Sequence, residues 1–137
     1  MKFIRYPALL CAALCFAGMS KAQTPTAGEL RKYCLSTQKG KTQQTTGDIF
    51  NTGVCMGYAR GFMDSIDGRT IYIEQKKTTY LLSVNKDAKE GGAIVAFLKF
   101  MDEHTDMFDG PALAAYIPAM VAAKIVTYTP IEQTNGK

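Results

Sequence analysis

The residues best suited to acid–base or metal chemistry surround His104, the only histidine in the sequence. Glu103 precedes it, and Asp106 follows two positions later. A histidine beside a carboxylate can act as a general base or a metal ligand, but either role needs further side chains around it. The sequence contains no HExxH motif, no Gly-rich phosphate loop and no nucleophile elbow that would supply them. We therefore expect a half-exposed histidine at a helix end, and neither a catalytic centre nor a bound metal or cofactor.

Asp64 and Asp67 are a second pair of residues that could take part in catalysis, as paired carboxylates of the kind that hydrolases use. Their spacing along one helix gives that interpretation little support. Asp64 shares its helix with Tyr58, Gly57 and Gly61. We interpret Tyr58 and Asp64 as buried hydrogen-bonding residues that fix packing.

The helix that must position these residues lies in the segment from Gly47 to Gly68. Its apolar residues recur at helical spacing, so they line one face. Gly57 and Gly61 form a second stripe beside that face, and each glycine costs about 1 kcal/mol relative to alanine in a helix interior. We expect another helix to approach this stripe closely and offset that cost. The apolar face comprises Val54, Cys55, Tyr58, Phe62 and Ile66.

Residues 1–22 have the pattern of a secretory signal peptide. Lys2 and Arg5 form a basic start, an uncharged apolar run covers 7–19, and Ala22 ends a small-residue cleavage site. The apolar run is shorter than the roughly 20 residues that span a bilayer as a helix. We therefore predict export to the periplasm, cleavage after Ala22, no membrane anchor and a single mature domain over 23–137.

Cys34 and Cys55 are the cysteines that remain after this cleavage. In an exported protein, two cysteines are best interpreted as a disulfide. Two free buried thiols are the alternative. A structural zinc site needs more ligands of this kind than the mature chain has.

The charge of the mature chain is close to balanced. Removal of Lys2, Arg5 and Lys21 brings the 16 basic residues of the sequence close in number to the 12 acidic ones. This balance does not suggest a nucleic-acid-binding protein. Basic residues predominate over 31–86 and acidic residues over 87–109, an asymmetry that can steer a charged partner.

Helices are also expected on both sides of the central one. A capping box at Thr26 begins a short helix that carries Cys34. An amphipathic helix follows Asp87, which we expect as its cap, and ends near Met107. Asp109 and the next two residues should cap a last, almost wholly apolar helix that runs to about residue 126.

Residues 69–84 are the least regular part of the sequence. An extended crossover with a short helical piece fits them, and so does a two-stranded ribbon, which would be marginal alone. Together these patterns predict an all-α fold, a compact bundle of four to five helices with one disulfide, with an extended segment at about 70–73 as an option.

The central helix resembles the C-x-G-Y-x-x-G-x-x-D core of the Rap/Tai family, the immunity proteins of type VI secretion amidase effectors. Cys34 before a polar loop and a closing pair of helices over 94–125 agree with that family. The resemblance covers about residues 30–125. The residues that match the core are Cys55, Gly57, Tyr58, Gly61 and Asp64.

The resemblance implies a periplasmic, helical immunity domain over 23–137 that binds a secreted peptidoglycan amidase, occludes its active site and catalyses no reaction. It also implies a homodimer, with which the apolar last helix is consistent. We expect the partner to contact a protruding loop or helix end, either the segment at 67–77 or the acidic end at 103–109. The acidic end is chosen because an amidase is often basic around its substrate groove. The residues chosen on this basis are Asp67, Arg69, Tyr72, Glu103, His104 and Asp106.

Two other classes of function compete with this one. A periplasmic acid-stress chaperone would expose apolar helices as its acidic cluster over 102–109 becomes protonated. A small cell-wall hydrolase would depend on Glu103 or His104. The short cysteine spacing favours the immunity protein over the chaperone.

Overall fold

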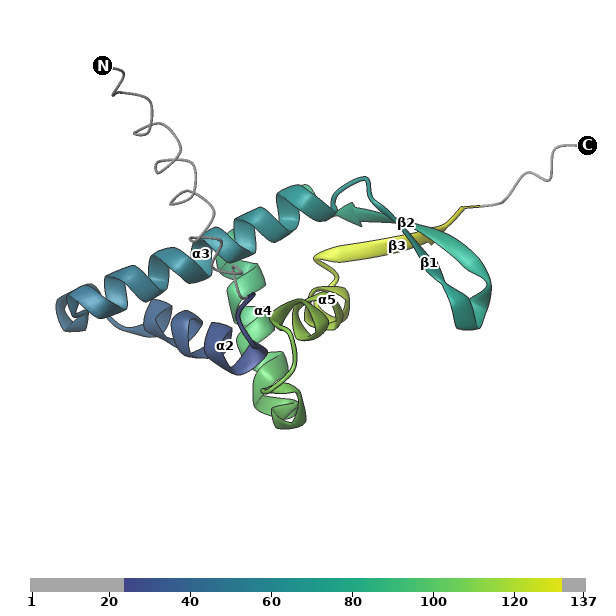
Figure 1. Ribbon diagram of the computed structural model, residues 1–137. Coiled ribbons are helices and arrows are strands. Elements are labelled where there is room, and N and C mark those ends of the chain that lie inside the picture. The colour runs from purple at the N-terminus through teal and green to yellow at the C-terminus, as the bar shows by residue number, and fades with distance from the viewer. Residues whose placement is uncertain (1–23, 132–137) are drawn as a thin grey trace, which may run out of the picture.

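The computed structural model describes residues 24–131, so the predicted signal peptide lies outside the described residues. Over this range four α-helices form a body from which a three-stranded sheet extends at one end (Figure 1). The helices are α2 (Ala27–Leu35), α3 (Thr46–Ile66), α4 (Glu90–Glu103) and α5 (Ala112–Ala122). The strands are β1 (Thr70–Ile73), β2 (Thr78–Val84) and β3 (Val126–Pro130).

The predicted all-α fold is wrong, because the chain is a mixed α/β protein. The sheet is antiparallel with the order β1-β2-β3. The hairpin extends well beyond the expected segment at 70–73, since Lys77 adopts a left-handed turn at φ 47° and β2 returns along β1. The last helix ends at Ala122 rather than near residue 126, and Lys124, at φ 57°, leads into β3. Val126 and the threonines after it are residue types that favour strands.

The predicted disulfide between Cys34 and Cys55 is confirmed. It joins α2 to α3 with a Cα–Cα distance of 5.0 Å, and both residues are buried. The capping box at Thr26 is also confirmed, since its hydroxyl accepts from the Glu29 N–H and the Glu29 carboxylate accepts from the Thr26 N–H. Thr45 and Asp48 form a second capping box, which begins α3.

The caps predicted for the two later helices are wrong. α4 begins at Glu90, beyond Asp87, and has no side-chain cap. α5 follows Pro111, again without a side-chain cap, because backbone from the start of the domain provides the partner. The Ala112 N–H donates to the Pro25 carbonyl at 3.0 Å, and the Ala27 N–H donates to the Gly110 carbonyl at 2.8 Å. At the start of α5, backbone groups from distant residues therefore pair with the groups that a helix end leaves free. The sequence had predicted a local side-chain cap there.

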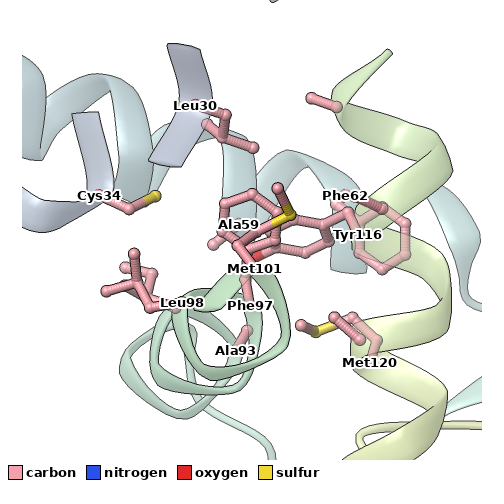
Figure 2. Packing of buried hydrophobic residues seen from close by; sticks show 14 of the residues in the cluster. Leu30, Cys34, Ala59, Phe62, Ala93, Phe97, Leu98, Met101, Tyr116 and Met120 are labelled. Carbon is pink, nitrogen blue, oxygen red and sulfur yellow. The ribbon is translucent and has the colours of Figure 1, made fainter. Parts of the chain in front are cut away.

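The core lies where all four helices meet, and Tyr116 of α5 occupies its centre (Figure 2). Its ring lies 4.9 Å from that of Phe62, 5.0 Å from that of Phe97 and 5.2 Å from that of Tyr58, measured between centroids. These contacts tie α5 to both α3 and α4 through aromatic pairs. Leu30 and Met101 are buried in the same cluster.

Removal of the disulfide should lower the free energy of unfolding by about 3 kcal/mol, because the bridge joins two residues that are 21 positions apart and so closes a loop in the unfolded chain. The variant is the double substitution of Cys34→Ala and Cys55→Ala, compared with the oxidised wild type by urea denaturation. Reduced wild type is the control and should match the variant. An unchanged midpoint would contradict the role given to the bridge.

Tyr116→Phe should leave the free energy of unfolding equal or raise it by about 1 kcal/mol, because the buried Tyr116 hydroxyl makes no hydrogen bond to any other residue within 24–131. Tyr116→Ala should lower it by about 3–5 kcal/mol through loss of the central ring. Thermal unfolding by circular dichroism measures both. A large loss of stability in Tyr116→Phe would show that the hydroxyl has a partner that stabilises the fold.

Candidate functional site

His104 ends α4, and its surroundings do not form an acid–base centre. Its ring stacks on that of Phe100 at 3.9 Å between centroids, and its Nδ1 lies 2.8 Å from the Phe100 carbonyl oxygen. Glu103 lines a shallow groove of about 250 Å³ between α4 and α5, whose walls are mainly alanine. Within residues 24–131, no ion pair to His104 and no group of metal-ligating side chains occurs. The geometry matches a helix-end histidine better than a hydrolytic site.

Asp48 is the best-connected charged residue of the described chain. It is buried, accepts from the Lys39 ammonium group at 2.7 Å and the Ser36 hydroxyl at 3.3 Å, and closes the capping box with Thr45. The Lys39 ammonium group, followed by hydrogen bonds from the Thr45 backbone and hydroxyl, holds the pKa of Asp48 far below its usual range. These contacts bind the polar loop between α2 and α3 to the start of α3, so Asp48 has a structural role.

The residues of α3 that match the family motif lie partly on the buried face of the helix and partly on its exposed face. Burial raises the pKa of the half-buried Tyr58, which packs edge-on against Tyr116. Asp64, expected to be buried, is instead largely exposed and lies 3.7 Å from Arg60. The prediction for Asp64 is therefore wrong, because this residue falls on the outer side of α3.

The expected close approach of a helix to Gly57 and Gly61 is also absent from the described chain. A Cβ atom built at either glycine, or at Gly53 one turn earlier, would meet no atom within 4 Å. The helix-propensity cost of about 1 kcal/mol for each glycine is thus not offset by packing against residues 24–131. These glycines leave an open strip along α3.

A polar cleft of about 400 Å³ lies where α3 meets the loop before α4. Arg60 stands at its edge, 3.7 Å from Asp64 on one side and 3.7 Å from Glu90 on the other. Asp67 also lines the cleft, but its Oδ1 accepts from the Val84 N–H at 2.8 Å. The ion pairs around Arg60 are exposed and long, so they contribute little to stability.

The sheet carries an apolar patch on the face that points away from the helical core. Opposite residues in antiparallel strands share a face, which places Tyr72 of β1 with Thr79 of β2, and Leu81 with Thr129 of β3. Ile131 continues the same face, since its N–H donates to the Thr79 carbonyl. We call Tyr72, Leu81 and Ile131 the sheet patch; all three side chains are exposed, Tyr72 by 59%.

The opposite face of the sheet explains why the patch remains free. Leu82 and Val126 on that face are buried in the helical core, and Tyr80 is buried against Tyr128 with ring centroids 5.5 Å apart. Sequence reasoning missed the patch because it left the conformation of 69–84 open. The alternation of residue types in Thr78–Val84 was the pattern that could have revealed it.

The residues predicted to contact a partner fall into two separate groups. Asp67 and Arg69 lie in the turn between α3 and β1, and Tyr72 lies in β1 itself. Glu103 is the last residue of α4, and His104 and Asp106 follow it. Asp67 is bound to Val84, and the Arg69 Nε–H donates to the Ser65 carbonyl. Tyr72 is therefore the member of the first group whose side chain is most clearly free to bind.

Comparison with protein-family models, curated proteins and solved structures finds no match to this chain. Among residues 24–131, no helix combines the length and apolar character needed to cross a membrane.

The low pKa of Asp48 predicts a loss of stability in acid. Because the pKa of Asp48 is lower in the folded than in the unfolded state, its stabilisation is complete above the unfolded value of about 3.9 and declines as pH falls below it. The melting temperature of the wild type should therefore drop more steeply than that of Asp48→Asn between about pH 5 and pH 2. Asp87→Asn, on an exposed turn, is the control and should follow the wild type. Parallel pH profiles for wild type and Asp48→Asn would contradict the assignment.

Proposed function

We propose that this protein is a periplasmic immunity protein, which binds a type VI secretion peptidoglycan amidase and occludes its active site without catalysing a reaction itself. The sequence resemblance at Cys34 and over Cys55–Asp64 supports the class of partner. The sheet patch supports the mode of action, and it is the observation on which the proposal chiefly rests. Exposed apolar side chains on a projecting element are typical of a protein–protein contact.

The shape of the sheet suits the blocking of a cleft. β1 and β2 extend beyond the helical body, and the tip between them is a narrow turn at Glu74–Lys77 (Figure 1). Tyr72 stands on the strand that leads to this tip, and tyrosine is among the residues that most often dominate binding energy. We therefore assign the main contact to the hairpin and a secondary contact to the acidic residues Glu103 and Asp106.

The disulfide supports the proposed compartment. A bridge with both cysteines buried is stable in an oxidising environment such as the periplasm. It also fixes α2 and α3 in the absence of a partner, so binding does not require the body to fold first.

An acid-activated chaperone is the second candidate, because the ion pair between Asp48 and Lys39 joins the loop after α2 to the start of α3. The low pKa of Asp48 means that acid withdraws the stabilisation that this carboxylate provides. Its loss would loosen the helices and expose their apolar faces. Suppression of client aggregation near pH 3 would support this function, whereas an immunity protein should show none.

Co-purification with the product of the adjacent gene tests the proposal. The oxidised protein should form a stoichiometric complex in which that product is a peptidoglycan amidase, and it should protect cells that express this amidase in their periplasm. Absence of binding to any neighbouring gene product would refute the immunity function.

Tyr72→Ala should weaken the complex by at least about 30-fold, as expected for a central contact residue. Isothermal titration measures the affinity. Thr127→Ala is the matched control, since Thr127 is exposed on the same sheet face near the helical body and should bind as the wild type does. If Tyr72→Ala binds with the same affinity as the wild type, the main contact with the partner lies outside the sheet patch.

A further inference from the structure

β1 and β3 form the two edges of the sheet, because β2 lies between them. An edge strand carries backbone N–H and C=O groups that no neighbouring strand binds, and these groups can pair with a strand of another protein. The register of the two ladders shows which residues direct such groups outward. The two edges differ in the groups that they offer.

On β1, the backbone groups of Thr70 and Tyr72 point away from β2. The Arg69 carbonyl accepts from the Leu82 N–H at 2.7 Å, which sets the alternation along the strand. In an antiparallel pair every second residue bonds to the neighbouring strand, so the odd-numbered residues of β1 bond to β2 and the even-numbered ones face outward. Within residues 24–131 no strand lies on the outer side of β1, and Thr70 and Tyr72 are both exposed.

The edge at β3 is protected at both of its ends. The Ile131 N–H donates to the Thr79 carbonyl at 2.8 Å, so Pro130 is one of the residues that face outward. Proline has no N–H to offer, and it is a common means of blocking an edge strand. At the other end of β3, Val126 is buried in the helical core. β1 contains neither proline nor a charged side chain, so it lacks this protection.

We propose that the partner protein contributes an extended segment, which pairs with the outer edge of β1 as a fourth strand of the sheet. This inference rests on the function proposed above, since the segment belongs to the amidase, at the rim of the cleft that the hairpin enters. Addition of a strand to an open edge is a recurrent mode of protein recognition. Backbone hydrogen bonds supply affinity in this mode, and alternate side chains supply specificity.

The sheet patch defines the apolar side of that segment. Tyr72 of the patch lies on β1 itself, and Thr70, opposite Leu81, lies on the same face. Every second side chain of an added strand extends this face, because side chains alternate along a strand. Apolar residues at those positions of the segment therefore continue the sheet patch across the new strand.

The hairpin tip defines the charge of the segment at one end. Lys76 and Lys77 are exposed there together with one acidic residue, Glu74. The tip thus has an excess of positive charge, whereas the four residues of β1 are uncharged. We expect uncharged residues beside β1 and an acidic residue where the segment passes the tip.

Amide hydrogen exchange of the wild type, measured for each residue by NMR, tests the pairing directly. In the free protein the N–H groups of Thr70 and Tyr72 should exchange rapidly, because they face solvent. In complex with the amidase that co-purifies, both should exchange at least about 10-fold more slowly, because they donate to the added strand. A complex in which both still exchange rapidly would overturn the strand pairing and leave the proposed function in place. Slow exchange in the free protein that depends on its concentration would place a second copy on this edge, and would also overturn the inference.

A proline substitution then tests the contribution of one backbone group. Thr70→Pro removes an outward N–H and keeps the bonds between β1 and β2, as Pro130 does on the other edge. It should weaken the complex with the co-purified amidase by at least about 10-fold in isothermal titration. Thr70→Val is the matched variant, which keeps both the shape of the side chain and the N–H, and it should bind at least about 10-fold more tightly than Thr70→Pro.

Equal affinity of the two variants would overturn the strand pairing, because the outward N–H would then make no difference to binding. Failure of the wild type to bind any amidase is a different result, since it overturns the proposed function together with this inference. The exchange measurement needs no substitution, so it decides between these outcomes even if Thr70→Pro does not fold.

Discussion

The bridge between Cys34 and Cys55 is the constraint on which the described structure depends. It holds α2 against the middle of α3 at a buried point, and the contacts of Asp48 fix the loop between the two helices from the other side. With this pair fixed, α4 and α5 can pack against its apolar side around Tyr116. A domain of this size gains much from such a link, since its single core is small.

The same constraint decides which surfaces remain free. Because the inner side of α3 is committed to the core, its glycines and Phe50 are directed outward. Because Leu82, Val84 and Val126 bring the inner end of the sheet into the helical core, the outer ends of the strands project beyond it. Residues 24–131 thus form a linked helical body with uncovered side chains on the outer side of α3 and on the sheet. This division is typical of a binding protein, whose rigid body presents contacts to partners.

The errors of the sequence interpretation have a common physical cause. The expected caps at Asp87 and Asp109, the burial of Asp64 and the packing of Gly57 were all inferred from neighbours along the chain. In the structure, the Pro25 carbonyl serves the start of α5, and no described element reaches the glycines. β3 similarly begins at Val126, where the sequence predicted the end of a helix, because β2 offers an open edge for pairing. The conformational preference of a short segment is overridden wherever a segment distant in the sequence pairs with it.

The sequence by itself predicted the helices of the body, the capping box at Thr26 and a disulfide between Cys34 and Cys55, because helical periodicity, capping residues and the number of cysteines can be recognised without knowledge of the fold. It also indicated the core face of α3. Only the tertiary structure decided the three-stranded sheet, the patch of Tyr72, Leu81 and Ile131, and the open strip of glycines along α3. Exposure is a property of the whole fold, since a side chain is free only when no distant segment covers it.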